Sequence, residues 1–194
     1  VDPADGKVLW KQETTLAPEA PLSAVVSGDV LVAAPQPTKA DVARYEGWKL
    51  TETGATKLWQ DAELQGDENI PVTVAGGRAY VCGKQFVRVL DVATGKQVAE
   101  RKFDQNGPGS NPWLGVVGDR LLFLPEGQHG VAHLQFLGPD LKELGPLWLP
   151  TNVETTAYNS QPLVYPVVDG RLFLRGGDGI YCYDLRTDRR EASR

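Results

Sequence analysis

Short apolar runs alternate with turn-forming residues along the whole chain, and one combination of the two occurs four times. Each copy has a valine, a tight turn rich in Gly and Asp, and an apolar run of four or five residues. Gly tolerates the positive φ that two-residue hairpin loops require, so each copy predicts a β-hairpin. The steps between the valines are 48, 43 and 51 residues. These valines are Val26, Val74, Val117 and Val168.

A second turn, rich in Asp, Thr and Gly, recurs between these hairpins at variable distances. Asp91 is expected to hydrogen-bond within its own turn, as short polar side chains do. In the clear copies Gly6, Gly54 and Gly95 are expected in the left-handed conformation that closes a bulged hairpin. Each unit is therefore predicted as strand, tight turn, strand, loop, strand, Gly turn, strand. The copies span 2–10, 50–59, 90–98, 137–148 (degraded) and 183–189.

Four antiparallel strands in about 45 residues are typical of one blade of a β-propeller. The sequence thus predicts an all-β fold, a single propeller domain over 1–194 with about four four-stranded antiparallel blades. A β-sandwich would not explain a repeating pair of different turns. Three arrangements stay open: a partial segment of a longer propeller, two copies pairing into one ring, or a small closed ring. The predicted blades are 21–64, 67–104, 108–150 and 161–188, the last completed by a strand at 7–14.

The strings Leu90–Lys96 (LDVATGK) and Asp5–Trp10 (DGKVLW) resemble the PQQ-like propeller repeat. That family includes quinoprotein alcohol dehydrogenases and the outer-membrane assembly lipoprotein BamB, and the resemblance fits a C-terminal or partial segment of such a protein. It implies a bacterial protein that is periplasmic or extracellular. It also implies that the tryptophan ending the fourth strand packs between blades. These are Trp10, Trp59 and Trp148, with Ala99 in that place in one unit, where weaker packing is expected.

Charge and hydropathy restrict the classes of partner. The chain carries 20 Lys and Arg against 25 Asp and Glu, and the basic residues form no cluster before the last few positions. Nucleic-acid binding is therefore not expected. No apolar run approaches the roughly 20 residues that span a bilayer. Because the chain begins at Val1 and has no Met, we expect a processed chain or part of a longer protein.

Catalytic, cofactor and metal residues are not assigned by the sequence. His129 and His133 lie four residues apart beside glycines, and along a strand that step is too long for one metal ion. Cys82 and Cys182 lie in apolar runs and are expected to be small buried residues. By resemblance, PQQ and Ca²⁺ would need adjacent cysteines and clustered acidic residues, which this sequence lacks. Asp178, in a Gly-rich string, is expected in a plain hairpin turn.

The leading prediction of function is a non-catalytic binding or scaffolding propeller that acts through protein or ligand contacts. The expected partner is another protein or further blades of a parent chain, and a homodimer is a further arrangement. One alternative is a segment of a PQQ-dependent quinoprotein dehydrogenase. Another is a carbohydrate-binding or carbohydrate-processing propeller. Candidate loop contacts are Trp48, Trp113 and Tyr158, although the tryptophans could instead pack between blades.

Overall fold

The computed structural model consists of four antiparallel β-sheets, without a helix in the part of the chain that it describes. That part comprises residues 5, 7–11, 22–35, 45–60, 72–83, 86–103, 113–124, 133–148, 166–176 and 178–186. In each sheet, neighbouring strands follow one another in the chain, so every sheet is a simple meander. The predicted all-β propeller fold is confirmed as an unclosed partial propeller.

The first and second sheets have four strands each. The first sheet contains β1 (Leu22–Ser27), β2 (Val30–Pro35), β3 (Glu46–Thr51) and β4 (Gly54–Gln60). The second contains β5 (Val72–Ala75), β6 (Arg78–Gly83), β7 (Phe86–Asp91) and β8 (Gln97–Lys102).

The third sheet also has four strands, and the last has three. The third contains β9 (Trp113–Val117), β10 (Arg120–Leu124), β11 (His133–Leu137) and β12 (Glu143–Trp148). The last contains β13 (Val167–Val168), β14 (Arg171–Gly176) and β15 (Gly179–Asp184).

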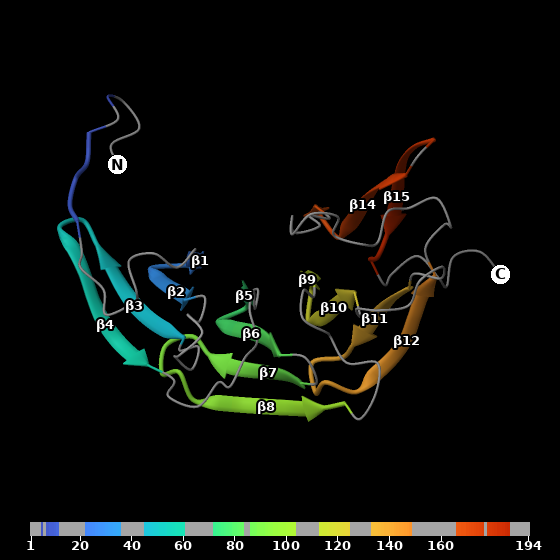
Figure 1. Ribbon diagram of the computed structural model, residues 1–194, viewed down its shortest axis with the longest axis horizontal. Coiled ribbons are helices and arrows are strands. Elements are labelled where there is room, and N and C mark those ends of the chain that lie inside the picture. Colours follow the sequence, from blue (N-terminus) through green and yellow to red (C-terminus); the bar gives the residue numbers. More distant parts are fainter. Residues whose placement is uncertain are drawn as a thin grey trace.

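The sheets stand side by side along an open arc (Figure 1). The first strands of neighbouring sheets contact one another on the inside of the arc, in the order β1, β5, β9, β13. The fourth strands β4, β8 and β12 form the outside. Each sheet is therefore one blade of the propeller, and the arc opens between the first and last sheets.

The tight turns adopt the positive φ that was predicted from their glycine residues. Gly76 and Gly77, between β5 and β6, have φ of 56° and 73°. Asp169 and Gly170, between β13 and β14, have φ of 49° and 70°. Both are two-residue hairpin loops with positive φ at both central positions, which match the twist of the flanking strands.

The second kind of turn is partly as predicted. Gly95 has φ of 70°, and its amide donates to the Asp91 carbonyl at 2.8 Å. The Asp91 carboxylate accepts from the Thr94 amide at 2.9 Å and hydroxyl at 2.7 Å. For Gly54 the prediction was wrong, because its φ is not positive. Gly54 instead begins β4 directly opposite Thr51, so a two-residue loop suffices there.

Three apolar clusters fill the three interfaces between neighbouring sheets. The first interface joins the first and second sheets, the second joins the second and third, and the third joins the third and last. Alternate residues of each second strand point to opposite neighbours. In β10, for example, Leu121 and Phe123 pack toward the second sheet and Leu122 toward the last. Strands buried on both faces explain the continuous apolar runs of the sequence.

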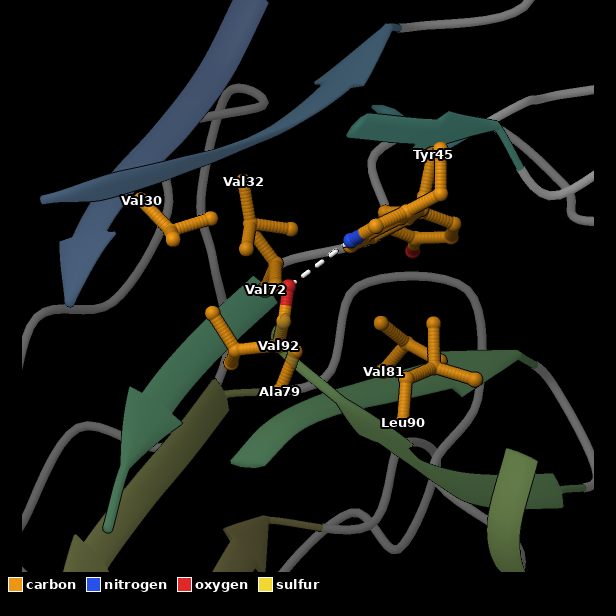
Figure 2. Packing of buried hydrophobic residues seen from close by; sticks show 9 residues of the cluster. Val30, Val32, Tyr45, Val72, Ala79, Val81, Leu90 and Val92 are labelled. Atoms are coloured by element: carbon orange, nitrogen blue, oxygen red, sulfur yellow. Dashed lines mark hydrogen bonds between the residues drawn. The ribbon is translucent and has the colours of Figure 1, made fainter. Parts of the chain in front are cut away.

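Figure 2 shows the cluster at the first interface, in which Val32 of the first sheet faces the second sheet. Trp59 of β4 belongs to this cluster. Its indole N–H donates to the Val92 carbonyl at 2.7 Å. The ring contacts two glycines so closely that a Cβ at Gly47 or Gly95 would come within 2.5 Å of it. Gly95 thus supplies both a left-handed turn and the space for the tryptophan of the preceding sheet.

Candidate interaction site

The outer strand of each four-stranded sheet contains a β-bulge at the same place. In β4 the extra residue is Leu58, between Lys57 and Trp59. In β8 it is Val98, and in β12 it is Leu144. These three outer bulge residues are 44%, 53% and 55% exposed, respectively. Bulges at sheet edges re-aim side chains, and each outer bulge here presents a large aliphatic group to solvent.

A local pattern of the sequence produces these bulges. Each outer bulge residue follows the second turn of its sheet by a few residues. It directly precedes the position that Trp59 occupies in the first sheet. Leu9 precedes Trp10 in the same way and is 57% exposed, although residues 7–11 carry no strand. Single exposed aliphatic residues are ordinary on protein surfaces, but these recur once in each four-stranded sheet. Sequence reasoning missed them, although the aliphatic residue before each Trp59-like position was the available signal.

Two charged side chains near the outer strands, Lys57 and Arg88, are held by partners within their own sheets. Lys57 contacts the buried Glu46 carboxylate at 2.6 Å and lies 5.1 Å from the centre of the Trp48 ring. Arg88 donates two hydrogen bonds to Glu100, at 2.7 and 2.9 Å. This pairing lowers the pKa of Glu100 against the opposing effect of burial. The sheets of Leu58 and Val98 thus each hold an ion pair that involves the outer strand.

The last sheet exposes a different surface. Leu172 and Leu174 of β14 pack toward the third sheet, so alternate residues of β14 and β15 point away from it. Ile180 is 78% exposed, and Cys182 is exposed as well. The expectation of a buried Cys182 was wrong, because Cys182 lies opposite Phe173 on the face turned away from the third sheet. The side chain of Cys82 lies outside the described residues.

The structure separates the tryptophans that the sequence grouped together. Trp59 is buried between sheets, whereas Trp148 is 60% exposed. The register explains this difference, because Gly145 rather than Trp148 follows the bulge of β12 where Trp59 follows that of β4. Trp148 therefore does not have the inter-blade position predicted for it. Trp10 is partly exposed and lies outside any strand.

The structure also places two of the candidate loop contacts on strands. Trp48 lies on β3 and is 6% exposed, and its indole donates to Glu46 at 3.1 Å. Trp48 is thus a buried strand residue rather than a loop contact, because it lies within β3. Trp113 is the first residue of β9. The Trp113 side chain, all of Tyr158 and the predicted turn residue Gly6 lie outside the described residues.

Within the described ranges, His, Cys, Asp and Glu do not gather in groups of three that could hold a metal ion. His133 is the first residue of β11, and His129 lies outside these ranges. Asp178 lies in the β14–β15 hairpin, whose ends Gly176 and Gly179 pair directly. The same ranges hold no helix long and apolar enough to cross a membrane.

Comparison with known proteins identifies the repeat. A family model described as "Outer membrane protein assembly factor BamB" matches residues 1–194. Among solved structures, the chain is similar to BamB from Moraxella catarrhalis, with a TM-score of 0.54 and 14% sequence identity. The match covers 82% of this chain and 41% of that one, so the arc spans less than half of that protein's length. No curated protein sequence matches the chain.

Proposed function

This chain belongs to the PQQ-like repeat family whose model is described as outer membrane protein assembly factor BamB, and we propose that it is a non-catalytic scaffold that binds a protein partner. The proposed setting is outer-membrane protein assembly outside the cytoplasm of a bacterium. Two facts support the proposal: the family match spans the whole chain, and the fold is an array of neighbouring blades. Rigid repeats present extended surfaces that suit protein partners.

The observation that carries this proposal is the repetition of the outer bulge residues Leu58, Val98 and Leu144. Protein interfaces combine apolar anchors with a polar rim. The sheets of Leu58 and Val98 also hold the ion pairs Lys57–Glu46 and Arg88–Glu100, and Glu143, which is next to Leu144, pairs with Arg101. A bulged edge also resists the addition of another strand. The outer surface is therefore proposed to bind through side chains.

The test is complementation in a bacterium that lacks its own copy of this protein. The wild-type protein should restore the level of β-barrel proteins in the outer membrane. A variant with Leu58, Val98 and Leu144 all changed to Ser should restore at least tenfold less, at unchanged abundance and melting temperature.

The matched control changes two other exposed aliphatic residues to Ser. Val26 and Val168 are 53% and 55% exposed but lie on the inner strands β1 and β13. This control variant should complement as the wild type does. Equal activity of the triple Ser variant would overturn the outer surface as the site. Failure of the wild type to complement would overturn the proposed assembly function itself.

A further inference from the structure

The first residues of the chain have the sequence pattern of the fourth strand that the last sheet lacks among the described residues. Among the described strands, the last sheet has three where each other sheet has four. The segment Gly6–Trp10 (GKVLW) matches Gly95–Ala99 (GKQVA), which leads into the fourth strand of the second sheet, and its Leu-Trp pair matches Leu58 and Trp59 of the first. In the structure residues 7–11 form no strand. They lie at the end of the arc occupied by β3 and β4, opposite β15 (Figure 1).

The strand β15 has the features of a third strand that receives a fourth. It pairs with β14 over six residue pairs without a register shift. In the first sheet Val32 pairs with Gly47, and Gly47 pairs with Trp59. In the last sheet Phe173 occupies the place of Val32 and pairs with Cys182. Cys182 is therefore the residue that a fourth strand would place opposite its tryptophan.

The face around this strand also continues the packing of the other sheets. The equivalents of Phe173 in the other three sheets are Val32, Tyr80 and Leu122, all of which are buried against the following sheet. Phe173 itself is only partly buried, and Ile180 beside it is 78% exposed. This face of the last sheet thus has the stacking pattern of the fold, with Arg171, Arg175 and Asp184 beside the apolar residues, and no following sheet packs on it among the described residues.

We propose that residues 7–11 of a second copy of this chain add to β15 as an antiparallel fourth strand. The equivalent pairing in the first two sheets sets the register, with Trp10 opposite Cys182 and Lys7 beside Asp184. Lys7 and Asp184 carry opposite charges, which favours this register over a slipped one. The first sheet of that copy then follows the last sheet of its partner.

A reciprocal exchange satisfies both copies at once. Each copy donates one strand and receives one, so the assembly has two-fold symmetry and closes without leaving a free site. Intramolecular pairing, which the sequence suggested for 7–14, would require the two ends of the arc to meet. In the structure those ends lie apart (Figure 1). The match covers 41% of the solved relative, so two such arcs together are no longer than that chain.

The experiment uses the full chain with Trp10→Cys, because the proposed register places this residue directly opposite Cys182. Directly paired residues of adjacent strands lie within the range of Cα separations that a disulfide accepts. Under mild oxidation, most of the chain should form covalent dimers. Peptide mapping should identify the bond as one between positions 10 and 182. Unmodified protein should have twice the chain mass by light scattering.

Two controls separate this register from chance oxidation of an exposed thiol. Lys11→Cys places the new thiol on the opposite face of the added strand, and it should form at least tenfold less of the bond to Cys182. The wild-type protein should form no comparable dimer through Cys182 alone. A bond between positions 10 and 182 within one chain would overturn the second copy as donor. Monomeric wild-type protein together with no such bond would overturn strand addition altogether.

Discussion

The first and second interfaces use the same two positions with the large and small residues exchanged. At the first interface the large residue is Trp59 on the outer strand of one sheet, and the small one is Gly95 in the turn of the next. At the second interface the outer strand carries Ala99, and the turn carries Leu141, which is 3% exposed. At these two positions each interface therefore has one large side chain. It comes from the preceding sheet at the first interface and from the following sheet at the second.

The backbone of Leu141 shows that the two positions are equivalent. Leu141 has φ of 61° and Gly95 has φ of 70°, and each precedes the residue whose carbonyl accepts the hydrogen bond that closes its turn. A left-handed conformation costs a residue with a Cβ about 1–2 kcal/mol. Burial of a leucine side chain stabilises by about 1.5–3 kcal/mol. The gain from filling the space left by Ala99 therefore offsets the strain in the turn.

The second interface has further contacts that the first lacks. Arg101 of β8 donates to the Leu141 carbonyl at 3.0 Å and to Glu143 at 3.1 Å. Phe103 makes an edge-to-face contact with Phe123 of the third sheet, with ring centres 5.5 Å apart. Leu141 and Phe103 thus belong to the same cluster as Ala99, and the weaker packing expected there stays a prediction.

Replacing Trp59 with Ala should have the largest effect. The change removes a buried indole from between Gly47 and Gly95 and leaves the Val92 carbonyl without its donor. We expect a loss of about 3–5 kcal/mol in the free energy of unfolding, as for other buried aromatic residues changed to Ala. Urea denaturation followed by circular dichroism measures this loss.

The matched control is Trp148→Ala, because Trp148 is 60% exposed. Its effect on the free energy of unfolding should remain below about 1 kcal/mol. Equal losses for the two variants would show that Trp59 does not anchor the first interface. The comparison of the two interfaces would then lose its physical basis.

Much of this architecture could be predicted from the sequence, because the tight turns and apolar runs act locally. The turn at Gly76 and Gly77 has the positive φ values that the residue types require. The exchange at Ala99 and Leu141 could not be predicted in this way. It joins residues about 40 positions apart, and a leucine is an unexpected residue for a left-handed turn. The degraded turn at 137–148 was the visible sign that the pattern changes there.

The candidate interaction residues were harder to predict for a similar reason. A bulge is a difference in register between two strands, and sequence patterning alone did not show that Leu58, Val98 and Leu144 are the extra residues. The positions of Trp48 and Trp148 were predicted wrongly, because an aromatic residue in a turn-rich segment or at the end of a strand can be either buried or exposed. Only strand pairing decides the face on which each side chain lies.

Exchanging the two residues of the second interface should produce a smaller, conditional effect. Ala99→Trp places an indole where Leu141 packs, and overpacking of this kind costs about 1–3 kcal/mol. Leu141→Gly restores the space and relieves the left-handed strain, so the double variant should resemble the first interface. A double-mutant cycle measured by urea denaturation should show favourable coupling of at least about 1 kcal/mol.

The cycle has a built-in control in the first interface. Gly95→Leu should be as damaging as Ala99→Trp, because its side chain would meet the Trp59 ring within 3 Å. Additive effects of Ala99→Trp and Leu141→Gly would mean that the two residues do not share one space. The two interfaces would then not be related by an exchange of a large and a small residue.

The smallest expected effect depends on pH and belongs to the first interface. Arg88 lies opposite Val81 on the face of the second sheet that packs toward the first, and it pairs with Glu100. The equivalent position in the third sheet is Gln135, opposite Phe123. The hydrogen bonds from Arg88 lower the pKa of Glu100 in the folded chain. Folding therefore favours the ionised carboxylate, and its stabilising contribution is complete only above the ordinary pKa of 4.5.

Glu100→Gln should accordingly reduce the free energy of unfolding by about 1 kcal/mol at pH 7. The difference from wild type should shrink as the pH falls below 4.5 and Glu100 of the wild type becomes protonated. Urea denaturation at pH 7, 5, 4 and 3 measures it. Asp140→Asn is the control, because its pair with Lys142 at 2.8 Å is exposed and should contribute little at any of these pH values. A difference that stays constant from pH 7 to pH 3 would mean that Glu100 acts through packing rather than charge, and the two interfaces would then differ only in the side chains that fill them.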